Sequence, residues 1–180
     1  SAFLLNRSSD LQLLRELGIE AELDLRANSE KGSNTSAFGF SRYASQGKVA
    51  SYYFTNDSGQ LPSDMTKYTW QYKWRLEFNF VVNNLRQGRS IYEHCVYGKD
   101  RTGYFSLLLE GLLGLSYNDL IREYELSYFW STSNSKKDSI DKVIEYINTM
   151  DGETLRDKFN KYFIKIFVNN QNYLSNYNYI

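Results

Sequence analysis

The residues with the clearest chemical potential are Cys95 and Arg101, which bracket five residues of the chain. A loop of that length can curl so that its backbone N–H groups converge on one anion. The arginine adds a planar fork of N–H donors that matches two oxygens of a phosphate group, which a lysine would not reproduce. We therefore expect this segment to bind a phosphate-type oxyanion with the cysteine sulfur at the base of the loop.

The same surroundings are expected to acidify the Cys95 thiol. A free cysteine has a pKa of about 8.5, and helix N-termini and nearby cations lower it to roughly 3.5–7.5. Here Arg101, Lys99 and the start of a helix all favour the thiolate, which is the attacking species in nucleophilic catalysis. These neighbours argue against the alternative that Cys95 is only a small buried apolar residue.

The elements around this loop are expected to be a short strand over 89–93 and an apolar helix from about 102 to 113. Ligands of open α/β sheets bind beyond the carboxyl ends of strands, where helix N-termini attract phosphate. Gly98 lets the backbone approach the ligand, and Gly103 permits close packing behind the loop.

His94 directly precedes the cysteine and is the only histidine of the chain. Its place at the end of a strand directs its side chain away from Cys95, because successive strand residues face opposite ways. We expect a supporting role, in which His94 hydrogen-bonds the loop and stabilises the thiolate indirectly. A general base and a satisfied core histidine are the alternatives.

The rest of the chain alternates strands and helices early and contains only helices late. On the helix expected over 65–85, the buried stripe is predicted to be Trp74, Phe78, Val81, Val82 and Leu85, at three- and four-residue steps. The other expected strands are 19–25 and 48–54, and the other expected helices are 8–18, 116–130, 137–149 and 153–170. This order predicts an α/β fold with a small, mainly parallel sheet flanked by helices, formed by residues 1–180 as a single domain.

Composition excludes several classes of function. Lys plus Arg and Asp plus Glu both number 21, so the chain lacks the basic field of a nucleic-acid-binding protein. No apolar run reaches the ~18 residues of a transmembrane segment. One cysteine and one histidine form neither an internal disulfide nor a Cys/His zinc site. We expect no metal and no cofactor.

The cellular location is left open by the sequence. No signal peptide is visible, and the chain begins with Ser-Ala-Phe rather than with methionine. Removal of an export segment would leave such a start, so cytoplasmic and exported locations are both compatible with it.

The segment 94–103, His-Cys-Val-Tyr-Gly-Lys-Asp-Arg-Thr-Gly, resembles the signature loop of the protein-tyrosine phosphatase superfamily. Its Lys99-Asp100 pair resembles the bacterial tyrosine phosphatases related to a secreted mycobacterial tyrosine and lipid phosphatase. Segments 17–26 and 111–127 agree, so the resemblance covers roughly residues 8 to 130. It implies a phosphatase fold of the dual-specificity type.

The resemblance also implies a two-step reaction through a phosphocysteine. Cys95 would attack phosphorus, water would hydrolyse the thiophosphate, and Thr102 would help the sulfur to leave. The charge stabilisation comes from backbone amides and arginine, so no metal is needed. The phosphate-binding residues are then Cys95, Val96, Tyr97, Gly98, Lys99, Asp100 and Arg101.

The general acid that protonates the leaving oxygen is not assigned by the sequence. Asp100 lies inside the loop, where the mycobacterial type places its acid. Asp57 follows a strand, as on the movable acid loop of dual-specificity phosphatases, although its spacing to Cys95 is longer than usual. Asp64 has a closer spacing in a poorer context. All three candidates stay open.

The expected substrate is a phosphorylated protein, chiefly at tyrosine and with dual specificity as an extension. A phosphoinositide or inositol phosphate is the first alternative, which the electropositive Lys99 favours. An inactive module that only binds phosphate, vanadate or sulfate is the second, and the joint presence of Cys95, Arg101 and Thr102 argues against it. A nucleotide-binding P-loop would need a Gly-Lys-Ser/Thr sequence, which this chain lacks. Arsenate reduction normally needs partner thiols, and the chain has one cysteine.

Overall fold

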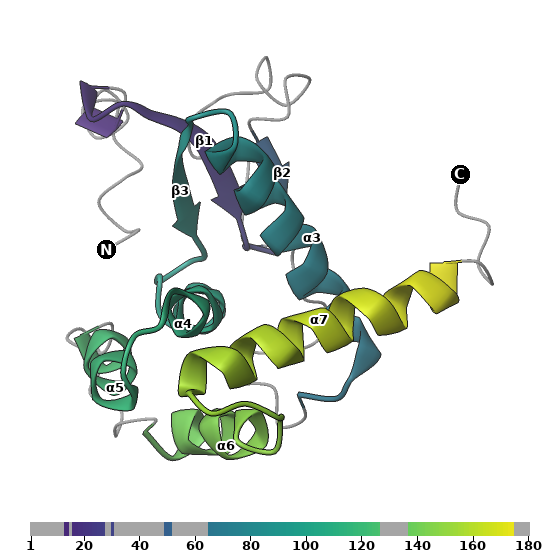
Figure 1. Cartoon of the computed structure of the whole chain (residues 1–180). Coiled ribbons are helices and arrows are strands. Elements are labelled where there is room, and N and C mark those ends of the chain that lie inside the picture. Colours follow the sequence, from purple (N-terminus) through teal and green to yellow (C-terminus); the bar gives the residue numbers. More distant parts are fainter. Residues whose placement is uncertain are drawn as a thin grey trace. The chain divides into compact units, whose positions relative to one another are not determined.

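The computed structural model describes residues 13, 14, 16–27, 30, 49–51, 65–126 and 137–174 (Figure 1). Most of the helix expected over 8–18 and of the strand expected over 48–54 lies outside these residues, and so do Asp57 and Asp64. The elements are β1 (Ile19–Asp24), β2 (Val49–Ser51), α3 (Tyr68–Leu85), β3 (Ser90–His94), α4 (Arg101–Leu113), α5 (Tyr117–Leu126), α6 (Lys137–Ile147) and α7 (Leu155–Leu174).

The three strands form one sheet in the order β2-β1-β3, and both pairings are parallel. Asp24, the last residue of β1, pairs with His94, the last residue of β3. The segments that leave β1 and β3 therefore start side by side at the carboxyl edge of the sheet, where open α/β sheets hold their ligands. The expected α/β fold with a small parallel sheet is confirmed.

The central strand β1 is buried on both faces, as parallel strands usually are. Ala21 and Leu23 fill one face with apolar side chains, whereas Glu22 and Asp24 place carboxylates on the other face. Glu22 is fully buried and Asp24 is nearly so. Buried carboxylates need partners, and those partners come from the segment around the predicted active loop.

The chain divides into two compact units, which are described separately. The first comprises Ser1–Gln60 and Leu76–Thr102, and the second comprises Leu61–Arg75 and Gly103–Ile180. The first unit contains the sheet and the loop that follows β3. The organisation of residues 1–180 as one domain stays a prediction.

The buried stripe of α3 differs in part from the predicted one. Trp74 and Val81 are buried as expected, but Leu85 is 59% exposed. The buried face ends instead at Asn84, whose side-chain amide donates to Phe80 O at 2.9 Å while its Oδ1 accepts from Arg89 Nη1 at 3.1 Å. Asn84 can be buried because these hydrogen bonds satisfy its amide, which a pattern based on apolar residues alone misses.

The second unit is packed around α7. Phe159, Tyr162, Phe163 and Ile166 form its buried stripe at helical spacing. The Tyr162 ring meets the Trp74 ring edge-on at 6.3 Å between centroids, and the Tyr162 hydroxyl donates to Met65 O at 3.1 Å. The hydroxyl is thus satisfied within an otherwise apolar core.

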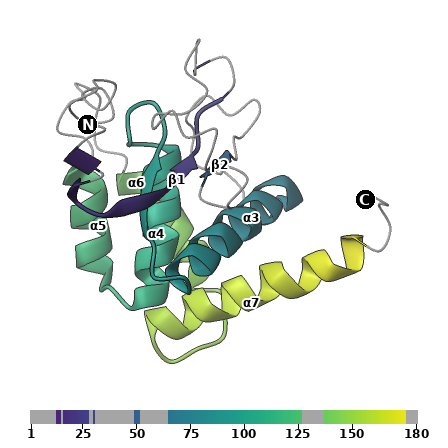
Figure 2. The ribbon, with the colours of Figure 1, turned by 90° about the horizontal axis from the view of Figure 1, so that it is seen from above.

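Close helix contacts in this unit depend on glycine. A Cβ at Gly111 of α4 would lie 2.5 Å from the Phe159 ring of α7, so only glycine permits this approach. Figure 2 shows the ribbons of α4 and α7 approaching each other. At the start of the same helix, a Cβ at Gly103 would lie 3.0 Å from the Tyr124 ring of α5. The close packing expected at Gly103 is confirmed.

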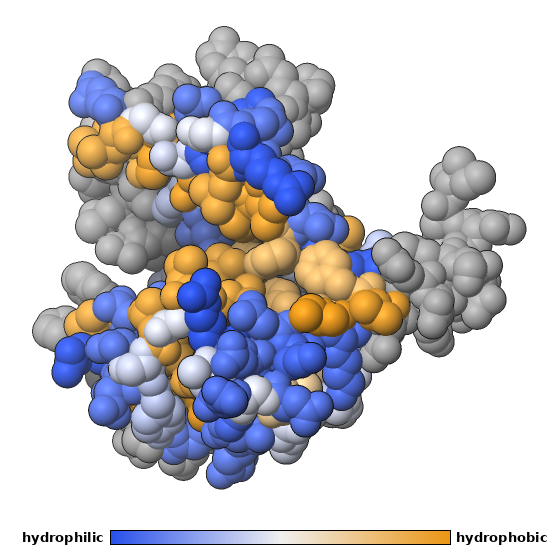
Figure 3. Space-filling view, in the orientation of Figure 1, coloured by the Kyte–Doolittle hydropathy of each residue, from blue (hydrophilic) through white to orange (hydrophobic). Residues whose placement is uncertain are grey.

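Helix α6 is amphipathic. Its residues Ile140, Val143, Ile144 and Ile147 are buried, and the surface over α6 in Figure 3 is largely hydrophilic. Such a division is typical of a surface helix that packs one face on a hydrophobic core. In the part of the chain that the structure describes, no helix has both the length and the apolar character needed to cross a membrane.

Candidate active site

The candidate site is built on the loop that joins β3 to α4. Strand β3 ends at His94, Cys95 follows directly, and α4 begins at Arg101. Gly98 has a φ of 69°, a left-handed conformation that glycine adopts without strain. The expected order of strand, loop and helix is confirmed, and the first backbone N–H groups of α4 stand where they can bind an anion.

Cys95 is a free cysteine and is only 3% exposed. Burial alone would raise the pKa of its thiol. Hydrogen bonding from the Thr102 hydroxyl and backbone, the positive charge of Arg101 and the Tyr97 backbone outweigh burial and lower the pKa. This combination favours a thiolate in a site with little water, which makes a strong nucleophile.

The Thr102 hydroxyl is held close to this sulfur. Its oxygen is buried and makes no hydrogen bond of normal geometry to any residue that the structure describes, although Thr102 contributes to lowering the pKa of Cys95. The hydroxyl hydrogen is therefore available to the Cys95 sulfur, and a negative charge on the sulfur favours that hydrogen bond. Thr102 is placed to stabilise Cys95 as a thiolate.

Alkylation by iodoacetate is expected to follow the lowered pKa of Cys95. The thiolate is the reactive form, so the alkylation rate should rise with pH through a midpoint below the ordinary thiol pKa of about 8.5. Cys95 is the only cysteine, so urea-unfolded chain serves as the reference for the same thiol. Inorganic phosphate should slow alkylation of the folded protein only. Equal midpoints for folded and unfolded chain would contradict the acidified thiol.

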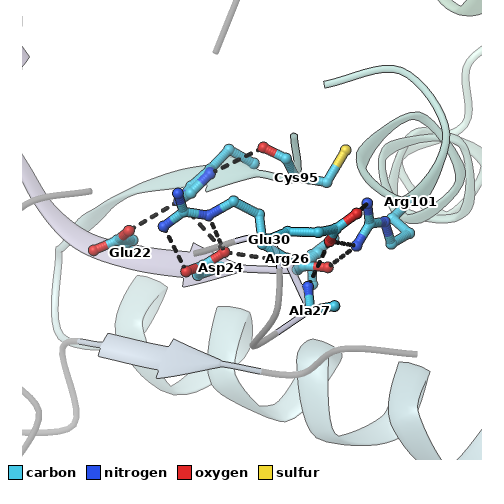
Figure 4. A network of polar contacts seen from close by, with 9 residues as sticks. Glu22, Asp24, Arg26, Ala27, Glu30, Cys95 and Arg101 are labelled. Carbon is cyan, nitrogen blue, oxygen red and sulfur yellow. Dashed lines mark hydrogen bonds and ion pairs between the residues drawn. The ribbon is translucent and has the colours of Figure 1, made fainter. Parts of the chain in front are cut away.

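Arg101 is hydrogen-bonded to residues of the segment that follows β1. Its Nη1 donates to Glu30 Oε2 at 2.6 Å and to Leu25 O at 2.9 Å, and its Nη2 donates to Glu30 Oε1 at 2.9 Å (Figure 4). Its Nε is buried and has no partner among the described residues. One side of the guanidinium is thus held by protein, and the other retains donors for a ligand.

His94 links the loop to the buried carboxylates of β1. Its Nε2 lies 2.8 Å from Glu22 Oε1 and its Nδ1 lies 3.3 Å from Cys95 O. The imidazole therefore touches the backbone of the cysteine and not its sulfur. His94 thus joins the loop backbone to Glu22, and its role in catalysis stays a prediction.

Asp24 and Arg26 form an ion pair beneath the site. The Asp24 carboxylate accepts from Arg26 Nε and Nη2, both at 2.9 Å, and from the Arg26 backbone N–H at 2.9 Å. Burial raises the pKa of Asp24, but these bonds and His94 lower it overall, so the carboxylate stays ionised. Figure 4 shows this pair beside Glu22, with the Cys95 sulfur on the Arg101 side.

Glu22, Asp24 and His94 also bring three potential metal ligands within 4.8 Å of one another. Each of them already serves the ion-pair network: Glu22 contacts His94, and Asp24 is occupied by Arg26. A cation placed there would compete with the Arg26 guanidinium. The group is best understood as support beneath the loop.

The remaining loop residues lie at the rim. Tyr97 is 69% exposed, whereas Val96, Gly98, Lys99 and Asp100 are half-buried. Asp100 stands next to Arg101 and is one of the charges that raise its pKa. The structure thus brings together all predicted loop residues and Thr102, while Asp57 and Asp64 lie outside the described part of the chain.

Comparison with known sequences decides the family. A sequence model of the Tyrosine phosphatase family matches residues 4–178 of this chain. The chain belongs to the tyrosine phosphatase family. A relative from Cupriavidus necator, named "Putative tyrosine-protein phosphatase", is 26% identical over 129 residues, which is 65% of this chain and 47% of the relative. This chain therefore spans about half the length of that relative.

In this member of the tyrosine phosphatase family, the sequence did not indicate two residues of the site. Glu30 pairs with Arg101, and Glu22 pairs with His94, across 71 and 72 residues of chain. Glu22 carried a signal, because a carboxylate inside an otherwise apolar central strand must have a partner. Glu30 carried a weaker one, because the segment after β1 shares the carboxyl edge of the sheet with the active loop.

Proposed function

We propose that this chain is a phosphomonoester hydrolase that works through a phosphocysteine on Cys95, with phosphotyrosyl proteins as its substrates. The observation that carries the proposal is the buried thiol with a lowered pKa at the start of a loop whose far end is Arg101. Family membership supports the reaction class. Nucleophile, anion-binding amides and arginine are the parts that phosphoryl transfer requires.

In the first step the Cys95 thiolate attacks phosphorus opposite the ester oxygen. The S–P bond forms, the P–O bond to the tyrosyl oxygen breaks, and that oxygen takes a proton from a carboxylic acid. Arg101 and the backbone N–H groups of residues 96–100 bind the equatorial oxygens. Because these donors are fixed before the reaction, they stabilise the developing charge without reorganisation.

In the second step water attacks the phosphorus of the phosphocysteine. The carboxylate left by the first step takes a proton from this water, the P–O bond to the water oxygen forms, the S–P bond breaks, and inorganic phosphate leaves. Cys95 departs as a thiolate, which the Thr102 hydroxyl and the charge of Arg101 favour through the same interactions that lower its pKa. The enzyme thus returns to its starting state.

Asp100 is the proposed general acid among the described residues, because it is half-buried in the loop beside Arg101. Asp100→Asn is expected to reduce kcat by about 10²–10³ on a phosphotyrosyl peptide, whose leaving group needs a proton. The loss on a phosphate ester with a much more acidic leaving group should be small. Asp57→Asn and Asp64→Asn are the comparison variants. The general acid is the residue whose replacement lowers kcat on the peptide but not on the ester with the acidic leaving group.

Turnover of defined substrates tests the proposed function. The protein is expected to release phosphate from phosphotyrosyl peptides with a higher kcat/KM than from phosphoseryl peptides or phosphoinositide vesicles. A higher kcat/KM on the vesicles would move the substrate class to inositol lipids. If the protein binds phosphate but turns over none of these substrates, it is not a phosphatase, and the alternative of an inactive phosphate-binding module is favoured.

A further inference from the structure

Tyr97 is the exposed residue of the loop between β3 and α4. Its side chain belongs to a residue that is 69% exposed, whereas every other residue of 95–102 is buried or half-buried. A single exposed aromatic residue is common on protein surfaces, so exposure by itself assigns no role. Tyr97, however, lies two residues after Cys95, the proposed nucleophile. Its place in the loop therefore brings an aromatic ring close to the proposed reaction.

The backbone of Tyr97 is tied to the sulfur of Cys95. Its N–H donates to that sulfur, and this hydrogen bond helps to lower the pKa of Cys95. Cys95 is only 3% exposed, so its sulfur lies at the floor of the loop. A residue with its N–H on a buried sulfur and its side chain in solvent extends from that floor to the opening of the loop. The Tyr97 ring therefore stands at the opening through which a phosphate ester reaches Cys95.

The loop is open next to Tyr97 because the following residue is glycine. The φ of Gly98 is 69°, so the backbone turns directly after Tyr97. Apart from the chain neighbours of Gly98, no atom of the described residues lies within 4 Å of where a Cβ on this glycine would stand. This open space beside Tyr97 leaves room for a group larger than phosphate.

The direction of the leaving group follows from the proposed reaction. The thiolate attacks phosphorus opposite the ester oxygen, so the alcohol part of the substrate points away from the sulfur and out of the loop. In phosphotyrosine this part is a flat aromatic ring. In phosphoserine it is a single CH₂ group, and in an inositol phosphate it is a puckered ring that carries hydroxyl groups. Of the three, only the aromatic ring can pair with a tyrosine ring in the offset or edge-on arrangements that stabilise aromatic contacts.

We propose that Tyr97 is a specificity-determining residue whose ring lies against the aromatic ring of a phosphotyrosyl substrate and so selects aryl phosphates over alkyl and inositol phosphates. This inference rests on the proposed function and deepens it. Backbone N–H groups and Arg101 bind the phosphate that all three substrate classes share. The Tyr97 ring contacts the part in which they differ, and specificity is a difference of this kind.

Tyr97→Ala tests the proposal through substrate preference. Two peptides of one sequence carry phosphotyrosine or phosphoserine at the same position. The substitution should lower the ratio of their kcat/KM values by about 10-fold, chiefly through a higher KM for the phosphotyrosyl peptide. Tyr97→Phe keeps the ring and should restore the preference. Leu113→Ala, which truncates a side chain that is also exposed, at the end of α4, is the matched control and should not move the ratio.

Two further readouts distinguish a substrate contact from damage to the loop. The Tyr97→Ala protein keeps the backbone N–H of residue 97. Inhibition by inorganic phosphate and the pH midpoint of Cys95 alkylation should therefore match those of the unaltered protein. A weaker phosphate inhibition together with a raised midpoint would show a structural role and overturn the proposal.

Binding without turnover completes the test. In the Cys95→Ser background, calorimetric titration should show that Tyr97→Ala weakens binding of phosphotyrosine by about 10-fold but not binding of inorganic phosphate. An equal loss for both ligands, or no loss for either, would overturn the proposal, as would tighter binding of phosphotyrosine. Turnover by the unaltered protein tests the proposed function separately, and this titration needs no turnover, so the two failures are distinguishable.

Discussion

Cys95→Ser is expected to lower kcat on a phosphotyrosyl peptide by on the order of 10⁶-fold, the scale of losing a covalent nucleophile. A serine hydroxyl nearly matches the thiol in size but does not ionise at neutral pH. The features that favour the Cys95 thiolate, namely Thr102, Arg101 and the Tyr97 backbone, cannot bring a hydroxyl into that range. Steady-state turnover with a discontinuous phosphate assay measures the loss.

Phosphate binding should survive this substitution. The donors that bind the anion are backbone N–H groups and Arg101, and none of them is altered in Cys95→Ser. Removal of the negative sulfur should even favour the phosphate electrostatically. Calorimetric titration with inorganic phosphate, together with an unchanged thermal unfolding midpoint, provides the control. Turnover within tenfold of the unaltered protein would remove Cys95 as the nucleophile.

Arg101→Lys is expected to lower kcat by roughly 10²–10³-fold, as does removal of other transition-state donors. The positive charge is kept, so a loss of this size would come from geometry. Lysine is a point charge that cannot present two parallel N–H groups, and it cannot make the two-oxygen contact with Glu30 at 2.6 and 2.9 Å. The effect should appear in kcat as well as in KM.

Arg122→Lys is the matched control for that measurement. Arg122 lies on α5 with 75% of its side chain exposed, and its ion pair among the described residues is a distant contact of 3.9 Å with Asp119. Its replacement should leave kcat and KM unchanged, because an exposed pair of this kind contributes little. If Arg101→Lys were as mild as Arg122→Lys, bidentate clamping of phosphate by Arg101 would be wrong.

The sequence predicted the loop between β3 and α4 because the required features are local. A strand, a five-residue loop and a helix start are encoded within residues 89–113, and Gly98 marks the point of positive φ. The parallel sheet followed from the order of strands and helices. These predictions depend on short segments whose chemistry leaves few alternatives.

The residues that the sequence did not reveal act across long separations. The contact of Glu30 with Arg101 depends on the register that sets Asp24 opposite His94, which no local pattern encodes. The prediction that Leu85 is buried was wrong for a related reason. The buried face of α3 includes Asn84, which is satisfied by Phe80 O and Arg89, and apolar periodicity does not anticipate a buried amide.

The most direct test of the central claim is to find where the phosphoryl group resides during turnover. Thr102→Ala should slow the departure of the sulfur, so this variant is mixed with a phosphotyrosyl peptide, rapidly denatured, digested and analysed by mass spectrometry. One phosphoryl group on Cys95 is expected, and it should be absent from the Cys95→Ser protein. A phosphoryl group on another residue, or turnover with none on Cys95, would contradict the phosphocysteine mechanism.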